Sequence, residues 1–425
     1  MKKVAFIVMR YGKEINGGAE LLCRMVSERM IKHWQIDILT TCAVDYVRWK
    51  NELPKGLETL NGVNIFRFPV SRERFLYVFN FIYGILAKVV ELQKTKRSRT
   101  VTFKRPILAA IYLFIFGPHF LGQFLEKVWM WLQGPSSAEL TRFIKQNIAR
   151  YDAFIFFTNS YATTYENITI VKDKAIVVPA AHDEPCLYFK LFESSTAHAK
   201  ALIYSTLEEK KLFENRFPFA RSIFNRIAGI GIENRQPGLS DRFRTKYNIS
   251  GNYVIYVGRI EESKGCDTLF EYFLDYLKLK KVDVTLVLLG KPSMAIPENS
   301  KIVSLGFVSE EDKFDAISGA NCLIMPSPYE SLSIVLLEAW MSNIPVIVNG
   351  ACEVLKGQCE RAQGGLAYTN YSQFDDALSK ILTDRDTSEK MARSGREFTE
   401  RTYTWSKIEN DYIDALKAVS KETLV

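Results

Sequence analysis

CLIMPSPYESLSIVLLEAW, residues 322–340, combines a short apolar run, a proline-containing loop and a largely apolar helix pattern. The two prolines of this loop end the predicted strand Cys322–Met325, because proline lacks the backbone donor that a strand needs. The apolar segment that follows predicts a helix, which Ser331 or Ser333 can cap. A strand followed by a helix is the repeating unit of a parallel sheet with helices on its faces.

The same unit recurs along most of the chain. Short β-branched runs alternate with helical stretches, and nearly continuous apolar strands are typical of parallel sheets that are covered on both faces. The sequence therefore predicts an α/β fold. The predicted strands are Val4–Val8, Ile36–Thr40, Asn64–Arg67, Ala153–Phe157, Ala175–Val178 and Ala201–Tyr204, then Tyr253–Val257, Val284–Leu289, Ile302–Leu305, Cys322–Met325 and Val346–Val348.

The length of 425 residues favours two domains, because it exceeds what one hydrophobic core usually supports. A polar stretch with proline and glycine, NRQPGLS at 234–240, marks the boundary between them. A short helix is predicted directly after it, over Asp241–Ile249. We therefore expect an N-terminal domain over residues 1–235 and a C-terminal domain over residues 236–404, with a cleft between them.

Composition and charge exclude several classes of protein. The net charge of +8 suits anionic partners such as phosphates or acidic lipid headgroups. The basic residues lack the aromatic or zinc-finger context of nucleic-acid-binding proteins, so no nucleic-acid partner is expected. Seven cysteines without a CxxC pair predict reduced thiols in the cytoplasm. The short apolar start predicts a buried strand rather than a signal peptide.

Residues 76–133 interrupt the alternation of strands and helices and are rich in aromatic residues. The apolar run Ile107–Phe116 is too short to span a bilayer. A basic segment next to an apolar helix is typical of a peripheral contact with an anionic membrane, whereas the alternative is a buried helix with a solvated loop. The six basic residues of this segment are Lys94, Lys96, Arg97, Arg99, Lys104 and Arg105.

Two glutamates, Glu330 and Glu338, follow the strand Cys322–Met325. The start of the next helix offers free N–H groups and a positive dipole end, which suit a diphosphate. Glu330 precedes that helix and can accept hydrogen bonds from sugar hydroxyls, and Glu338, about two turns further on, can reach a diol such as ribose. Two solvated surface charges would give the same spacing, but the apolar flanks of Glu338 disfavour that interpretation.

A second motif, YVGRIEESKG, follows another predicted strand. Gly258 ends the strand, and Arg259 and Lys264 place two cations in the loop. Fixed cations at this position stabilise the charge that develops on a departing diphosphate, without a metal ion. Taken alone, the loop would equally fit ordinary surface charges.

Two further motifs follow strands in the first half of the chain. NGGAE contains Gly17 and Gly18, which let the backbone approach a ligand, but it lacks the other residues of a P-loop or a dinucleotide-binding loop. VVPAAHDEP places His182 and Asp183 in a loop after a strand. A histidine at such a position is a candidate for proton or ligand contacts, although a structural role is equally common.

These motifs, in this order and together with NIFRFPV, QGPSSAEL and LGFVSEED, resemble glycosyltransferase family 4 over nearly the whole chain. The resemblance implies the GT-B fold, with two Rossmann-like domains facing across a cleft. It also implies retaining, metal-independent transfer of a sugar from a nucleotide-diphosphate sugar to a glycan. A final helix over 405–425 is expected to pack back on the N-terminal domain.

The resemblance also implies roles for individual residues. Those implied in catalysis are Glu330, Arg259, Lys264 and His182. Those implied in donor binding are Gly17, Gly18, Gly258, Gly306, Phe307, Val308, Ser331, Leu332, Ser333 and Glu338. Within the donor set, Glu338 would hold the ribose, and Gly306, Phe307 and Val308 would line the base pocket. Asp183 would lie on the acceptor side. Many members of the family have glycine where this chain has Ser333.

No metal ion and no other cofactor is expected. The acidic pair Asp384 and Asp386 follows a helix instead of a strand, which predicts a surface loop. The basic segment and the resemblance together predict a lipid-linked acceptor in bacterial surface polysaccharide biosynthesis, such as that of O-antigen, and a peripheral position on the cytoplasmic face of the membrane. Two alternatives stay open: a GT-B nucleotide-sugar epimerase, and a non-catalytic sugar-nucleotide-binding subunit.

Overall fold

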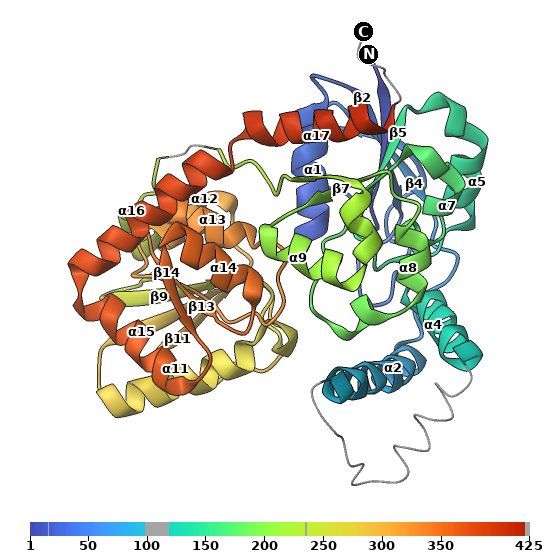
Figure 1. Ribbon diagram of the computed structural model, residues 1–425. Coiled ribbons are helices and arrows are strands. Elements are labelled where there is room, and N and C mark those ends of the chain that lie inside the picture. The colour runs from blue at the N-terminus through green and yellow to red at the C-terminus, as the bar shows by residue number, and fades with distance from the viewer. Residues whose placement is uncertain (16, 98–118, 234–235, 421–425) are drawn as a thin grey trace, which may run out of the picture. The chain divides into compact units, whose positions relative to one another are not determined.

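The computed structural model describes residues 1–15, 17–97, 119–233 and 236–420 (Figure 1). The chain forms two compact units, one made of Met1–Ala228 with Glu409–Val425 and the other of Gly229–Ile408. The division lies a few residues before the predicted boundary between 235 and 236. The last helix, α17 (Trp405–Val419), runs into the first unit, to which its residues from Glu409 onward belong.

The first unit contains an eight-stranded sheet with the order β3-β4-β2-β1-β5-β6-β7-β8. All neighbouring strands are parallel except β3, which is antiparallel to β4. The six strands predicted in this half are confirmed. The strands are β1 (Lys3–Ile7), β2 (Gln35–Thr41), β3 (Gly56–Leu60), β4 (Val63–Phe68), β5 (Ala153–Phe157), β6 (Ala175–Val178), β7 (Ala201–Tyr204) and β8 (Phe224–Ile227).

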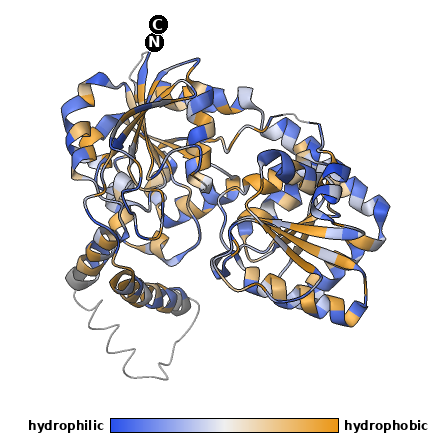
Figure 2. Ribbon diagram, turned by 180° about the vertical axis from the view of Figure 1, so that it is seen from behind, coloured by the Kyte–Doolittle hydropathy of each residue, from blue (hydrophilic) through white to orange (hydrophobic). Residues whose placement is uncertain are grey.

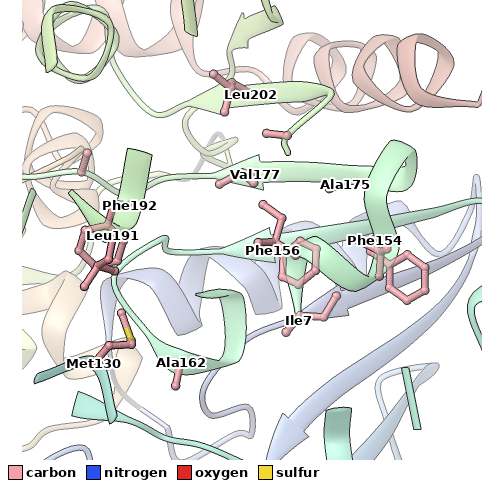
Figure 3. Packing of buried hydrophobic residues seen from close by; sticks show 14 of the residues in the cluster. Ile7, Met130, Phe154, Phe156, Ala162, Ala175, Val177, Leu191, Phe192 and Leu202 are labelled. Carbon is pink, nitrogen blue, oxygen red and sulfur yellow. The ribbon is translucent and has the colours of Figure 1, made fainter. Parts of the chain in front are cut away.

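Apolar side chains of the central strands pack into the core of this unit. Figure 3 shows Ile7, Phe154, Phe156, Val177 and Leu202 in one cluster, and all five are fully buried or nearly so. Burial on this scale is the main source of stability of a parallel sheet. The α-helices of the unit are α1 (Gly18–Met30), α2 (Leu76–Arg97), α4 (His119–Gln133), α5 (Ala138–Asn147), α6 (Ala162–Tyr165), α7 (Ile168–Val171), α8 (Leu191–Thr196), α9 (Leu207–Arg216) and most of α17.

The second unit contains a six-stranded parallel sheet with the order β11-β10-β9-β12-β13-β14. The five strands predicted here are confirmed, and β14 is additional. The strands are β9 (Asn252–Val257), β10 (Val284–Leu289), β11 (Ile302–Gly306), β12 (Leu323–Met325), β13 (Val346–Asn349) and β14 (Gly365–Tyr368). The helices are α10 (Ser240–Tyr247), α11 (Cys266–Lys280), α12 (Glu310–Ser318), α13 (Ile334–Met341), α14 (Glu353–Ala362), α15 (Tyr371–Thr383), α16 (Arg385–Thr402) and the start of α17.

Both sheets reverse their direction of growth next to their first strand. In the second unit the reversal lies between β9 and β12, and in the first unit it lies between β1 and β5. Doubly wound sheets bind ligands at the carboxyl ends of the strands beside such a reversal. The predicted α/β architecture with two Rossmann-like sheets is therefore confirmed, and the loops after β9, β12 and β1 are where functional residues are expected.

The predicted insert is represented by α2 and α4, which flank a part of the chain outside the described residues (Figure 1). The apolar run Ile107–Phe116 and the greater part of the basic segment fall in that part. Of the six basic residues, only Lys94 has a described side chain. The membrane prediction made from this segment therefore stays a prediction.

Candidate functional site

The strand reversal of the second unit brings together two of the residues predicted to be catalytic. Lys264 lies in the loop after β9 and Glu330 in the loop after β12, the neighbouring strand. The Lys264 Nζ donates a hydrogen bond to Glu330 Oε1 at 2.8 Å. The two side chains are only 25% and 15% exposed, so the ion pair is largely shielded from solvent.

The loops that carry these residues approach each other closely at Gly265. This residue follows Lys264 and adopts a φ of 74°, in the left-handed region that glycine tolerates best. A Cβ atom at this position would lie 2.4 Å from the carbonyl oxygen of Pro326. Glycine is therefore needed both for its conformation and for the close packing that holds Lys264 against Glu330.

Arg259, the second predicted cation, is fixed at the same edge of the sheet. Its NH1 donates to Glu261 Oε2 at 3.1 Å, and its side chain is 39% exposed. Its carbonyl oxygen accepts a hydrogen bond of 2.6 Å from the hydroxyl of Tyr256. Burial raises the pKa of Tyr256, which keeps the phenol protonated as a donor. Gly258 lies between these residues with a φ of 155°.

Glu338 lies on α13 and is buried, with 8% of its surface exposed. Lys313 of α12 donates to Glu338 Oε1 at 2.9 Å and also pairs with Glu310 at 2.9 Å. Burial lowers the pKa of Lys313, but the charges of Glu338 and Glu310 outweigh that effect, so its pKa is raised. Lys313 is a further residue of this site and is not among those predicted from the sequence.

The start of α13 differs from the prediction. The helix begins at Ile334, and Ser333 occupies the cap position, but its side chain makes no capping hydrogen bond. The predicted side-chain cap by Ser333 is therefore wrong, and its φ of 66° lies in the left-handed region. Ser331 lies two residues before the cap position. Glycine adopts this left-handed conformation without a steric cost, which explains why glycine is common here in the family that the sequence resembles. Leu332 is buried, and its carbonyl oxygen accepts from Gln358.

The residues predicted to line a base pocket follow β11. Gly306 has a φ of 66°, and its carbonyl oxygen accepts a 2.7 Å hydrogen bond from the backbone N–H of Gly290. Phe307 is 70% exposed, whereas Val308 is partly buried. An aromatic ring held in solvent at a strand end is available for stacking on a planar ligand.

Gly17 and Gly18 lie at the strand reversal of the first unit, at the start of α1. Arg10, from the loop after β1, donates through its Nε to Glu20 Oε1 at 2.8 Å, and both side chains are buried. A Cβ on Gly17 would lie 2.2 Å from Glu20 Oε2, so the ion pair requires glycine there. A Cβ on Gly18 would meet no atom within 4 Å, so its backbone borders open space.

His182 lies in the loop after β6, and a buried carboxylate anchors the base of that loop. Glu209 accepts a 2.8 Å hydrogen bond from the Ala181 N–H and a 2.5 Å bond from the Ser205 N–H. Burial raises the pKa of Glu209 to about 7, although these N–H donors lower it. His182 itself is 31% exposed, with its Nδ1 3.5 Å from Glu184 Oε1.

Glu209 is not among the residues predicted from the sequence, although Thr206 and Glu209 have the spacing of a helix capping box. Thr206 does accept from the Glu209 N–H, at the start of α9.

Asp183, the predicted acceptor-side residue, contacts the helix α2. Lys94 Nζ donates to Asp183 Oδ1 at 2.7 Å, and the Tyr188 hydroxyl donates to the same oxygen at 2.6 Å. The Lys94 ammonium also lies 4.0 Å from the centre of the Tyr188 ring. The last turns of α2 are thus bound to the loop that carries His182 and Asp183, which the sequence could not indicate.

Within the described ranges, no group of three or more His, Cys, Asp or Glu residues has the arrangement of a metal site. Asp384 accepts from the Thr387 N–H at 3.0 Å and caps α16, so its carboxylate has a structural partner. Asp386 is exposed in the first turn of the same helix. The acidic pair therefore lies at the start of a helix, where a surface loop was predicted.

Comparisons with known proteins identify a family model and several similar chains. Residues 240–398 match the family model of glycosyl transferases group 1. An uncharacterized glycosyltransferase of Methanocaldococcus jannaschii is 22% identical, over 98% of this chain and 98% of its own. The Anabaena protein HepE, solved with UDP-glucose, superimposes with a TM-score of 0.66 at 13% identity, covering 98% of this chain and 100% of that one.

A second similar structure is WaaG, a glycosyltransferase involved in lipopolysaccharide biosynthesis, with a TM-score of 0.60 at 15% identity over 98% of this chain and 100% of that one. At these identities the structural matches establish the fold, and the family model covers the unit that contains Arg259, Lys264, Glu330 and Glu338. The chain therefore has the GT-B fold, and its residues 240–398 form a glycosyl transferases group 1 domain.

Proposed function

We propose that the protein is a retaining glycosyltransferase of family 4 that transfers a hexose-type sugar from a nucleotide-diphosphate donor to a glycan acceptor. The observation that carries the proposal is the ion pair between Lys264 and Glu330 at the strand reversal of the group 1 domain. Doubly wound sheets bind nucleotides at this point, and the pair supplies one group for phosphate and one for sugar hydroxyls.

In the proposed mechanism, Arg259 and Lys264 stabilise the charge that builds on the β-phosphate as the sugar–phosphate bond breaks. Lys264 is neutralised by Glu330 before the donor binds, so the donor phosphate has to compete for the ammonium. Sugar hydroxyls that donate hydrogen bonds to Glu330 would replace the contact that its carboxylate loses when Lys264 turns to the phosphate. Fixed cations of this kind need no reorganisation during the reaction, which is why they lower its barrier.

Nucleoside recognition is assigned to two elements of the same unit. Glu338 would accept hydrogen bonds from the ribose hydroxyls, with Lys313 keeping the carboxylate ionised and oriented. The exposed ring of Phe307 would stack on the base. The complex of HepE with UDP-glucose supports a nucleotide sugar as the co-substrate. In the first unit, Gly17, Gly18, His182 and Asp183 keep their predicted roles towards donor and acceptor.

The acceptor is proposed to be lipid-linked, in the synthesis of a bacterial surface polysaccharide, with the protein peripheral on the cytoplasmic face of the membrane. The basic segment in the sequence and the similarity to WaaG, which is involved in lipopolysaccharide biosynthesis, support this assignment. No metal ion is proposed to take part, and the support is that Arg259 and Lys264 both lie in the loop after β9, at the strand reversal.

The test is a panel of nucleotide sugars. Donors that raise the melting temperature would be incubated with glycan acceptors, and the products would be analysed by mass spectrometry and by NMR of the anomeric proton. A glycoside with the anomeric configuration of the donor is expected. An isomerised or hydrolysed sugar without an acceptor would favour the epimerase, and binding without turnover would favour the sugar-nucleotide-binding subunit.

A further inference from the structure

Large apolar side chains are exposed on the two helices that flank the insert. Tyr77 is 94% exposed and Phe81 69%, which is unusual for aromatic residues of a folded domain. Figure 2 shows hydrophobic residues on both helices next to the grey trace. We name these exposed residues together the aromatic face: Phe75, just before α2, Tyr77, Val78 and Phe81 of α2, and Phe124 and Trp131 of α4.

The helix α2 is apolar enough for a membrane but is fixed to its own domain. Leu76–Lys94 is long enough to cross a bilayer, with a mean hydropathy of 1.3, and only 17% of that window is buried. The opposite side of α2 packs on the core, where Phe79 and Tyr83 stack on Trp129 with ring centres 6.2 and 6.1 Å apart. A helix held in this way can lie along a lipid surface, but it cannot cross one without losing that packing.

The charges around the aromatic face suit a lipid surface. No charged residue occurs in the sequence between Arg74 and Lys88, so the first half of α2 has an uncharged exposed side. Cations lie beside it: Arg72 stacks on Trp131 with its guanidinium 3.2 Å from the ring centre, and Lys127 of α4 is exposed. Aromatic residues with flanking Lys and Arg are the composition of segments that bind at the boundary of headgroups and acyl chains.

We propose that the aromatic face docks on an anionic lipid bilayer, with α2 and α4 lying in the plane of the interface. Tyr77, Val78 and Phe81 enter the boundary of headgroups and acyl chains, and Arg72 and Lys127 contact the lipid phosphates. The proposal deepens the proposed function, because it identifies the surface through which a lipid-linked acceptor is reached. It differs from the prediction made from the basic segment, since all of its residues are described.

Tryptophan fluorescence tests the contact directly. The chain has six tryptophans, and five of them are 8% exposed or less, whereas Trp131 is 52% exposed. Vesicles of phosphatidylglycerol and phosphatidylcholine with brominated acyl chains should quench the emission of the wild-type protein at low salt. Trp131→Phe should remove that quenching while the protein still floats with the vesicles. Quenching that persists in Trp131→Phe, or no quenching at all, would overturn the proposal.

Flotation of variants tests which residues carry the binding. Tyr77→Ser/Phe81→Ser should bind anionic vesicles at least about tenfold more weakly, because two exposed aromatic groups no longer enter the interface. The matched control is Leu57→Ser/Leu279→Ser, which changes two residues that are 63% and 65% exposed outside α2 and α4. Equal binding of the two double variants would contradict the assignment, as would equal binding to neutral and anionic vesicles.

A different partner would give a different result. If the aromatic face joined two copies of this chain, Tyr77→Ser/Phe81→Ser would change the sedimentation coefficient without vesicles, and the membrane proposal would be wrong. Donor consumption with a soluble acceptor tests the proposed function alone, because this reaction needs no membrane. Tyr77→Ser/Phe81→Ser should leave its rate unchanged. Vesicle binding in a protein that consumes no donor would refute the proposed function alone.

Discussion

The ammonium nitrogen of Lys264 lies 2.8 Å from Oε1 of Glu330, although 66 positions separate the two residues in the sequence. The contact exists because β9 and β12 are neighbours in the sheet, so the loops after them meet at the same edge. The side chain proposed to bind phosphate is thus the partner of the side chain proposed to bind sugar. Each substitution at one of them therefore changes the state of the other.

Lys264→Ala and Arg259→Ala should each slow donor consumption by about 10²–10³-fold, because each removes a cation from the proposed leaving-group site. The measurement is kcat/KM for the best donor of the panel. Lys278→Ala, at an exposed position of α11 in the same unit, is the control and should behave as wild type. Wild-type rates in both site variants would show that the leaving group binds elsewhere.

The variants Glu330→Ala and Glu338→Ala should separate sugar recognition from nucleoside recognition. Glu330→Ala frees Lys264 from its ion pair, so binding of the bare nucleoside diphosphate should be kept or strengthened while transfer is impaired. Glu338→Ala removes the proposed ribose partner and should weaken binding of both the nucleoside diphosphate and the intact donor. Isothermal titration with nucleoside diphosphate and with the intact donor measures the difference. Equal affinity losses in the two variants would contradict these roles.

Donor consumption should continue in excess EDTA, because Arg259 and Lys264 are proposed to stabilise the leaving group in place of a divalent metal ion. Asp384→Ala is the accompanying variant. It should lower the melting temperature through loss of the α16 cap, and it should not change the rate. Inactivation by EDTA that added Mg²⁺ or Mn²⁺ reverses would refute metal independence and return attention to Asp384 and Asp386.

Glu209 should make stability depend on pH. Its folded pKa of about 7 is above the value of about 4.3 for an exposed glutamate, so the folded state binds its proton more tightly. The free energy of unfolding should therefore fall by about 3 kcal/mol as the pH rises from about 4 to about 7, and then level off. Denaturant unfolding at a series of pH values measures this slope.

Glu209→Gln is the informative variant for that slope. It removes the titrating group and turns an amide NH2 towards one of the two backbone N–H donors, so the pH dependence should flatten and the protein should be less stable by about 1–3 kcal/mol. Glu208→Gln, at the neighbouring and more exposed position, should keep the wild-type slope. An unchanged slope in Glu209→Gln would assign the effect to another group.

Lys94→Met should weaken binding of the acceptor more than binding of the donor. Lys94 and Asp183 are 42% and 58% exposed, so their ion pair should contribute about 1 kcal/mol or less to stability. Its loss releases the loop after β6 from α2, which should raise the KM for the acceptor and leave the affinity for the donor unchanged. Lys88→Met, which disrupts the exposed pair with Glu91 within α2, is the matched control. A change in donor affinity alone would contradict the acceptor-side prediction for Asp183.

The sequence by itself determined where the buried strands lie and which loops follow them. The predicted limits of β5, β6, β7 and β10 agree with the structure at both ends, because a strand buried on both faces requires a continuous apolar run. The order of the motifs along the sequence also indicated the GT-B fold, which the comparisons confirm. The edge strand β3 was missed, since four of its five residues are exposed, so it lacks the continuous buried apolar run that marks the other strands.

Only the tertiary structure decided which charged residues face each other. The pairs of Lys264 with Glu330, Lys313 with Glu338 and Lys94 with Asp183 join residues far apart in the chain. Local periodicity reports whether a residue is buried, but the pairing depends on strand order and helix packing. The same holds for α17, whose residues from Glu409 belong to the first unit, where Glu409 pairs with Arg29 and Lys32 and Tyr412 is fully buried. Such contacts depend on the packing of the whole unit, which no short stretch of sequence contains.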